Sequence, residues 1–315
     1  MLMQNNFDPQ IAILLSIYNG SSYLQEQLDS LLNQSYKNLI ILVRDDGSVD
    51  SSIEIVKSYS KILNIIILED SQNIGVKKSF SYLLKYAIDK LDSTYFMFCD
   101  QDDIWKTDKV EKTLLKIIEV EKFYKNKPIL IHSDLKLVDN NLNEMYESFW
   151  KFEKIDPKKN SFNNLLLQNT ITGCTVMINK SLAEKSIEIP ESCIMHDWWI
   201  GLVASYFGVI SYIDDKTILY RQHESNTIGA QGYTYTTVLK KIFAYSRNGD
   251  INKNIAQAKI FLDKYKDDLD EGTLKMLLDF SNINSKSFIQ RRIILVKYRL
   301  WKQGIVRNLG LLIKI

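Results

Sequence analysis

The chain has 315 residues, of which 45% are hydrophobic and 25% charged, as in an ordinary soluble globular protein of one large domain or two. Its formal net charge of +2 gives no indication of nucleic acid or another polyanion as a partner. Cys99, Cys174 and Cys193 form neither a CxxC pair nor a disulfide framework, so a reducing compartment is expected. The N-terminus shows no signal-peptide pattern and no window holds about 18 apolar residues, which predicts a cytoplasmic protein or one bound to the inner face of the cell membrane.

The first half of the chain alternates between short apolar runs and longer amphipathic segments. Continuous runs such as IAILL at 11–15 predict buried strands, whereas Leu24, Leu28 and Leu31 lie at helical spacing. In chain order the pattern predicts strands within residues 11–15, 38–48, 64–70, 94–100 and 128–134, and helices within 16–34, 48–63, 73–91 and 106–124.

Repeated strand–helix units predict an α/β fold with a mostly parallel sheet and helices on both faces. In such sheets ligands bind beyond the carboxyl ends of the strands, so the residues that follow each strand are the place to look for function. Most of these residues are polar and many are acidic: 16–19, 45–48, 70–75, 100–103 and 132–134.

Beyond about residue 150 the pattern is looser. Residues 170–185 predict a strand, a turn and a helix, and residues 196–208 predict a helix. Residues 209–223 predict a strand or a hairpin, and the chain is mostly helical after about residue 233.

The most acidic strand end is DQDD, in which Asp100, Asp102 and Asp103 fall within four residues. Carboxylates spaced in this way can hold a hard cation such as Mg²⁺ or Mn²⁺ through oxygen, together with substrate phosphates. The alternative is a solvated turn in which Asp103 caps the following helix.

Two other strand ends suggest a nucleotide. In RDDGSVD, Asp46 is positioned to accept a hydrogen bond from the imide N–H of uracil or thymine, and Tyr18 in SIYNG is positioned to lie against a base. The alternative for RDDGSVD is a plain Asp-Gly turn followed by a helix cap.

Two motifs in the second half carry further candidates. In HDWW, Asp197 is a candidate general base for a sugar hydroxyl, or it caps the helix that follows. In YRQH, the charge of Arg221 suits a diphosphate and His223 suits a metal or a phosphate, although a lone histidine is more often structural.

The ordered set SIYNG, DDGSVD, NIGV, DQDD, TGC, HDWW and YRQH resembles the family 2 inverting glycosyltransferases, over roughly residues 10–228. DQDD with the nearby Trp105, together with HDWW, is most similar to the bacterial rhamnosyltransferase-like subgroup. The resemblance implies the GT-A fold, a Rossmann-like mostly parallel sheet with flanking helices, over residues 1–230. Residues 231–315 are then a helical C-terminal extension.

The resemblance also implies roles for the matching residues. Asp197 matches the catalytic base, although the family often has an acidic residue where His196 precedes it. Asp100, Asp102 and His223 match metal ligands, with Asp103 adjacent. The implied nucleotide pocket contains Ser16, Tyr18, Asn19, Asp45, Asp46, Asn73, Gly75, Lys77, Asp100 and, as a weaker match, Arg221. The implied sugar and acceptor pocket contains Gly173, Cys174, His196 and Trp198.

The resemblance therefore implies transfer with inversion, assisted by Mg²⁺ or Mn²⁺, from a nucleotide-sugar donor. L-Rhamnose from dTDP-rhamnose is the favoured sugar, and a growing cell-surface polysaccharide or a lipid-linked oligosaccharide is the favoured acceptor. A UDP-hexose donor and a non-catalytic sugar-nucleotide-binding protein are the alternatives. A nucleotidyltransferase is disfavoured because the chain has no GxxxxGK[ST] phosphate loop.

The end of the chain differs in charge from the rest. Residues 280–315 contain eight basic residues and no acidic one. Helical projection places basic residues such as Arg292 and Arg299 opposite apolar ones such as Ile293 and Trp301, as in a helix that lies on a membrane surface. The alternative is that the apolar face docks on the catalytic domain, and Gly304 and Gly310 disfavour one continuous helix.

Overall fold

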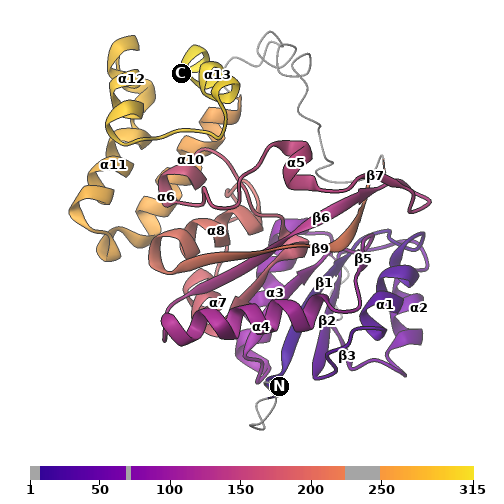
Figure 1. The fold of residues 1–315 in the computed structure, drawn as a ribbon. Coiled ribbons are helices and arrows are strands. Elements are labelled where there is room, and N and C mark those ends of the chain that lie inside the picture. Colours follow the sequence, from indigo (N-terminus) through magenta and orange to yellow (C-terminus); the bar gives the residue numbers. More distant parts are fainter. Residues whose placement is uncertain (1–7, 69–71, 224–248) are drawn as a thin grey trace.

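The computed structural model describes residues 8–68, 72–223 and 249–315 of the chain. Its centre is a nine-stranded sheet in the order β3-β2-β1-β4-β8-β6-β9-β5, with β7 paired to β6 (Figure 1). The strands are β1 (Ile11–Ile17), β2 (Leu39–Asp45), β3 (Ile65–Leu68), β4 (Tyr95–Cys99), β5 (Ile104–Trp105), β6 (Ile129–Val138), β7 (Glu144–Tyr146), β8 (Met177–Asn179) and β9 (Val209–Arg221).

The predicted mostly parallel sheet is confirmed. β1 pairs parallel with β2 and β4, β2 with β3, and β6 with β9. The short strand β8 runs antiparallel between β4 and β6, and β5 and β7 add antiparallel pairs at β9 and β6. Residues 209–223, predicted as a strand or a hairpin, contain the single long strand β9.

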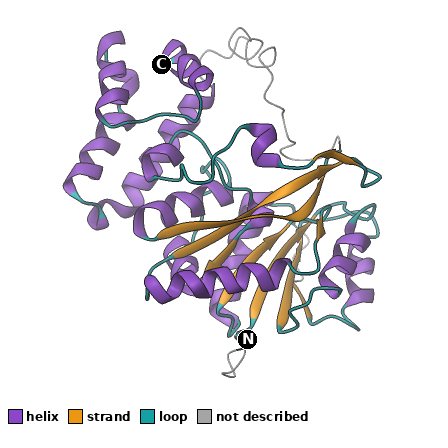
Figure 2. Cartoon of the chain, viewed as in Figure 1, coloured by secondary structure: helices purple, strands orange, loops and turns teal. Residues whose placement is uncertain are grey.

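Helices cover both faces of the sheet (Figure 2). On one face, α1 (Leu24–Leu32), α2 (Ser52–Tyr59) and α4 (Lys109–Phe123) pack against Ile11, Ile13 and Leu15 of β1. On the other face, α3 (Val76–Lys90), α7 (Lys180–Ser186) and α8 (His196–Phe207) pack against Ala12 and Leu14. Successive residues of a strand point to opposite faces, so an uninterrupted apolar run supplies both cores.

The short helices α5 (Phe149–Glu153) and α6 (Phe162–Leu165) precede a 3-10 turn, Gly173–Thr175, which leads into β8. Helices α10 (Gly249–Tyr265), α11 (Glu271–Ser281), α12 (Phe288–Lys297) and α13 (Ile305–Lys314) form the C-terminal part. The expected boundary at residues 230/231 lies outside the described residues.

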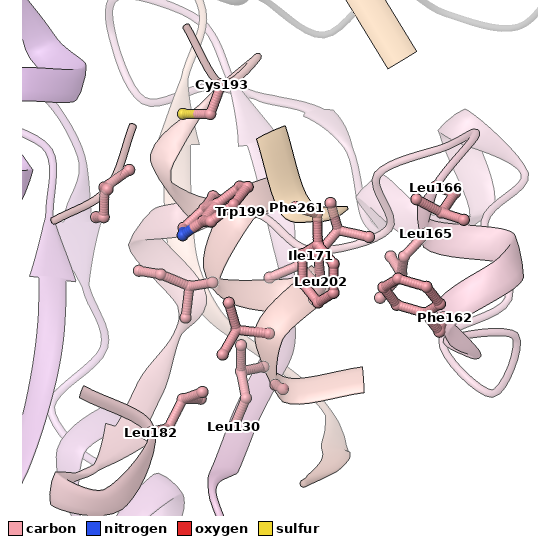
Figure 3. Close-up of a cluster of buried hydrophobic side chains, with 14 of the residues drawn as sticks. Leu130, Phe162, Leu165, Leu166, Ile171, Leu182, Cys193, Trp199, Leu202 and Phe261 are labelled. Atoms are coloured by element: carbon pink, nitrogen blue, oxygen red, sulfur yellow. The ribbon is translucent and has the colours of Figure 1, made fainter. Parts of the chain in front are cut away.

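The C-terminal part shares a core with the second face of the sheet. Phe261 of α10 lies 4.9 Å from the ring of Phe162 and 5.8 Å from that of Trp199, measured between centroids (Figure 3). Side-chain amides add polar ties: Asn163 donates to the Tyr298 carbonyl at 2.7 Å. Burial of these aromatic side chains fixes the extension against α6 and α8.

The basic end of the chain is not one helix. α12 and α13 are separated by residues 298–304, where Arg299 and Gly304 take positive φ values of 51° and 85°. Gly304 adopts this left-handed conformation without steric cost because it has no Cβ atom. Gly310, by contrast, lies inside α13.

Candidate active site

A cleft of about 1070 Å³ opens at the carboxyl ends of the parallel strands. It is built where β1, β2 and β4 end, and its other wall comes from the residues before α8 and from the C-terminal part. Thirteen of the residues singled out from the sequence line it: Ser16, Tyr18, Asn19, Asp46, Asn73, Gly75, Asp100, Asp102, Gly173, His196, Asp197, Trp198 and His223.

Four residues named with them are not part of the lining among the described residues. Asp45 accepts hydrogen bonds from the N–H and hydroxyl of Ser48, and so closes the turn after β2. Lys77 donates to the carbonyls of Glu191 and Cys193.

Arg221 and Cys174 are the other two. The guanidinium of Arg221 is buried, where it donates to the Asp102 and Asn140 carbonyls and pairs with Glu26. Cys174 is buried beside Asp103. Both residues therefore lie behind the cleft lining, where Arg221 contacts Asp102 and Cys174 contacts Asp103.

Asp46 accepts hydrogen bonds from three donors. Its buried carboxylate pairs with Arg44 and accepts the backbone N–H groups of Ile74 and Gly75, each at 2.8 Å. Oδ1 accepts from both Arg44 and Ile74, whereas Oδ2 accepts from Gly75. Oδ2 therefore has room for a second hydrogen bond, such as one from the imide N–H of a base. Asp46 thus fixes the loop that follows β3 and still lines the cleft.

Gln101 is a residue that the sequence reasoning missed. Its side-chain amide accepts from the Tyr18 N–H at 2.8 Å and donates to the Tyr18 carbonyl at 3.0 Å. This pair joins the loops after β1 and β4, with the half-exposed ring of Tyr18 at the cleft. The signal was its position between Asp100 and Asp102 in the sequence.

The acidic strand end brings its carboxylates together. Burial raises the pKa of Asp100 to about 7, and the negative charges of Asp102 and Asp197 add to the rise. Asp102 lies 2.8 Å from Nε2 of His223, whose ring stacks on Tyr23. A bound cation would relieve the repulsion between these carboxylates.

A second group of possible ligands lies deeper. One ligand atom each of Asp100, Asp103 and Cys174 falls within 4.8 Å of the others. Burial raises the pKa of Asp103 well above its usual range, with further contributions from Asp102 and Asp100, and Asp103 and Cys174 do not line the cleft. Hard cations such as Mg²⁺ and Mn²⁺ bind mainly through oxygen, so the Cys174 thiol suits them poorly. The carboxylates of Asp100 and Asp102, together with the His223 imidazole at the cleft surface, fit these ions better than the buried set does.

Asp197 lies in the first turn of α8, beside the 3-10 turn. Its carboxylate accepts from the N–H of Trp198 at 2.6 Å and from the N–H of Gly173 at 3.1 Å. Asn169, also missed from the sequence, gives it a side-chain hydrogen bond. Burial raises the pKa of Asp197 to about 6 although these donors oppose the rise, so the group is ionised and basic near neutral pH.

His196 precedes Asp197 but faces an apolar wall. Its ring stacks on Phe80 with centroids 4.2 Å apart, and neither nitrogen has a hydrogen-bond partner within the described residues. Burial lowers its pKa to about 3, so the ring is neutral. Trp198 donates its indole N–H to the Leu165 carbonyl and forms part of the cleft wall.

Comparisons with known proteins agree with this architecture. Residues 12–185 match the family described as Glycosyl transferase family 2. The dTDP-rhamnosyl transferase RfbG of Shigella flexneri is 29% identical over 231 residues, which cover 69% of this chain and 74% of RfbG.

Two solved structures share the fold. Residues 1–349 of Staphylococcus aureus TarS, in complex with UDP-GlcNAc, align with a TM-score of 0.58 at 19% identity, over 92% of this chain and 80% of that one. The mannosyltransferase PcManGT of Pyrobaculum calidifontis, in complex with GDP-Man and Mn²⁺, aligns with a TM-score of 0.53 at 12% identity, over 98% of this chain and 84% of that one. The family match spans more than half of the chain, and with the ordered motifs and the strand-end cleft it shows that this protein belongs to glycosyltransferase family 2 and is a GT-A-fold transferase that uses a sugar-nucleotide donor.

Proposed function

We propose that this enzyme transfers L-rhamnose from dTDP-rhamnose, with inversion, to a hydroxyl group of a growing cell-surface polysaccharide or a lipid-linked oligosaccharide. The observation that carries the chemistry is Asp197, an ionised carboxylate of raised pKa that lines the same cleft as Asp100, Asp102 and His223. The similarity to RfbG supports the choice of donor.

In the proposed reaction Asp197 accepts the proton of the acceptor hydroxyl. The hydroxyl oxygen then attacks the anomeric carbon while the bond from that carbon to the diphosphate breaks on the opposite face. The backbone N–H of Gly173 and the Asn169 side chain keep the Asp197 carboxylate oriented. The neutral ring of His196 and the Trp198 indole line the cleft next to it.

The donor lies at the strand ends in this proposal. The base stacks on Tyr18 and meets the oxygen of Asp46 that retains hydrogen-bonding capacity, and Ser16, Asn19, Asn73 and Gly75 complete that part of the lining. Asp100, Asp102 and His223 are positioned to hold Mg²⁺ or Mn²⁺. When bound, such an ion offsets the charge on the leaving diphosphate.

A UDP-hexose is the second candidate donor. TarS was crystallised with UDP-GlcNAc, and its fold covers 92% of this chain. The same carboxylates would serve that donor, so the two candidates differ in the pocket for the sugar and the base rather than in the chemistry.

The C-terminal part supports action at the inner face of the cell membrane. Ile289, Ile293 and Val296 form one stripe along α12, and Ile305, Leu309 and Ile313 form one along α13. These six side chains are 53–80% exposed. Among the described residues, no helix is both long and apolar enough to cross a bilayer.

These stripes differ from the single apolar face that helical projection predicted for the end of the chain. Of the apolar residues on the face predicted to contact lipid or to dock, which also includes Ile294, Leu300, Ile305 and Leu311, only Ile293 and Ile305 are among the exposed ones, whereas Ile294, Leu300 and Leu311 are buried in the shared core. Each helix thus uses one apolar face for docking and presents another outward. Lys286 lies just before α12 and Lys297 is its last residue, where Asp279 lies 3.6 Å from the Lys297 ammonium group.

A thermal-shift panel tests the donor. The protein is heated with dTDP-rhamnose, UDP-glucose, UDP-galactose, UDP-N-acetylglucosamine or GDP-mannose, each with and without Mn²⁺. A ligand that binds only the native state raises the melting temperature by mass action. A metal-dependent shift with dTDP-rhamnose alone is the expected result, a shift with one UDP-sugar instead changes the donor, and no shift with any of them refutes the proposed donor site.

A further inference from the structure

Helix α10 buries two side-chain amides within its apolar face. Asn254 is 2% exposed and Gln257 is 1% exposed, and they lie on the same side of the helix as the buried Ala258 and Phe261. The family match ends at residue 185, so α10, which packs beside α6 and α8, lies outside it (Figure 1). Burying an amide costs free energy unless its polar groups are hydrogen-bonded, so the partners of these two side chains show what they do.

Each amide binds a different segment of the cleft wall. The Asn254 side chain donates to the Leu166 carbonyl at 2.8 Å. The Gln257 side-chain oxygen accepts from the backbone N–H of Ile194, also at 2.8 Å. Residues 165–173 and residues 191–195 both contribute to the cleft lining. One helix therefore fixes two stretches of the wall that are distant in sequence.

Both stretches lead to the proposed base. Residues 191–195 run directly into α8, whose second residue is Asp197. Residues 165–173 supply the side chain of Asn169 and the N–H of Gly173, which both donate hydrogen bonds to the Asp197 carboxylate. The position of Asp197 thus depends on the two stretches that α10 holds.

Other contacts hold the same stretches from other sides. Lys77 of α3 donates to the carbonyls of Glu191 and Cys193 at 2.5 and 2.8 Å. The Trp198 indole donates to the Leu165 carbonyl at 2.5 Å. Because these contacts remain when an α10 amide is replaced, such a change should loosen the wall locally and leave the fold intact.

Gln257 is an unfavourable residue if its role is only to dock the helix. Among the described residues, its buried Nε2 has no hydrogen-bond partner and its side chain does not line the cleft. A methionine of similar length would pack there without an unpaired N–H group. Packing therefore favours an apolar side chain at this position, whereas the contact with Ile194 requires an oxygen.

We propose that Asn254 and Gln257 are positioning residues for Asp197, so that the C-terminal part completes the active site through α10. This inference rests on the proposed function, because it assigns the two amides to the base of that reaction. They act through the segments that they hold. Since displacement of a catalytic group by about 1 Å can lower a rate about 100-fold, a small shift of either segment would reduce turnover.

The first test needs no substrate. Amide hydrogen exchange of the full chain is followed by mass spectrometry in the parent, in Gln257→Met and in Asn254→Leu. We expect the N–H of Gly173 to exchange about tenfold faster in both variants, because Asp197 no longer stays in place to accept it. Parent-like exchange in either variant would remove that residue from the proposal.

The matched control is Asn252→Leu. Asn252 lies on the exposed side of α10, where Asn284 donates to its side chain at 3.0 Å. The substitution is the same as at Asn254, but we expect exchange at Gly173 and the melting temperature to keep their parent values.

The second test separates positioning from packing. Gln257→Glu keeps an oxygen for the Ile194 N–H but buries a carboxyl group, whereas Gln257→Met removes the acceptor and suits the apolar surroundings. We expect Gln257→Met to melt at or above the parent temperature and Gln257→Glu to melt below it. Exchange at Gly173 should show the opposite order, fast in Gln257→Met and close to the parent rate in Gln257→Glu.

Turnover provides a third measurement. With dTDP-rhamnose, Mn²⁺ and water in place of the acceptor, water attacks the anomeric carbon, its proton passes to Asp197, and dTDP is released. We expect kcat for dTDP release to fall about tenfold in Gln257→Met, with KM for the donor unchanged, and to recover in Gln257→Glu.

Two results would overturn the inference. One is exchange or kcat that follows the melting temperature of the Gln257 variants rather than the presence of the acceptor oxygen. The other is a raised KM for the donor with kcat unchanged, because the amides would then serve donor binding. Failure of the proposed function is seen separately, as the absence of a metal-dependent thermal shift with any nucleotide sugar, and the exchange measurement does not depend on a donor.

Discussion

The two ends of the cleft differ in charge and in how the chain builds them. At one end, Asp46, Asp100 and Asp102 follow directly from parallel strands, so the sheet itself brings them together. At the other end, Lys253 and Lys302 come from the C-terminal part, where their neighbours Asn254 and Gln303 donate hydrogen bonds to Leu166 and Gln168. The comparison shows that the acidic end follows from the topology of the sheet, whereas the cationic end depends on how the extension docks.

Removing the proposed base, Asp197, should have the largest effect. Asp197→Asn keeps the size of the side chain but cannot accept the proton, and its single amide oxygen keeps the hydrogen bond from only one of the two backbone N–H groups, Trp198 or Gly173. We expect transfer to fall about 10³-fold while the donor-induced thermal shift stays within error. Asp263→Asn, an exposed change on α10, is the control, and near-normal turnover of Asp197→Asn would exclude it as the base.

Removing a carboxylate of the acidic end should break donor binding itself. Asp102→Ala eliminates the group that contacts His223 at 2.8 Å. We expect metal-dependent donor affinity to drop at least about 100-fold, measured by calorimetry with Mn²⁺. Parent-like, metal-dependent affinity in the variant would show that the ion is held elsewhere.

The pH dependence separates the base from the acidic end. The pKa of Asp197 is raised to about 6, so the protonated, inactive form accumulates as the pH falls below that value. At saturating donor and Mn²⁺, whose charge would keep Asp100 ionised, we expect kcat to fall about tenfold per pH unit below pH 6 and to be level above it. A level profile of kcat down to pH 5 would contradict this assignment.

The smallest effect on chemistry is expected from the outward face of the extension. Ile289→Ser/Ile293→Ser removes apolar surface that contacts no core. We expect binding to anionic phospholipid vesicles to weaken roughly fivefold or more, with turnover of a soluble acceptor unchanged.

Ile62→Ser serves as the control for that vesicle experiment, because Ile62 is equally exposed but lies far from the extension in sequence. Equal vesicle binding by the parent and the double variant would mean that this face does not contact lipid. The melting temperature of each variant shows whether the fold is retained.

The sequence predicted the parts of this molecule that local pattern determines. Continuous apolar runs identified β1 to β4 and β6, and the polar residues at their ends identified the acidic half of the cleft. The antiparallel strands β5 and β7 were missed, since two or three residues give no periodicity, whereas β8 lies within residues 170–185, where a strand was expected.

The remaining parts depend on contacts between distant residues. Nothing in the sequence near Lys253 or Lys302 indicates that the adjacent residues, Asn254 and Gln303, donate hydrogen bonds to Leu166 and Gln168. The hydrogen bonds from Arg221 to the Asp102 and Asn140 carbonyls could not be predicted either, because the charge of Arg221 alone suggested a diphosphate ligand.

The Gln101–Tyr18 pair has a consequence for tolerance to substitution. A Cβ atom added at Gly20 would overlap the side-chain amide of Gln101, although the backbone of Gly20 is not left-handed. An alanine there would displace Gln101 and release the loop that carries Asp100 and Asp102. A saturation-mutagenesis map should therefore show a modest cost of alanine at Gly20, equal to the loss of the Gln101–Tyr18 pair, and no such cost in a Gln101→Gly background.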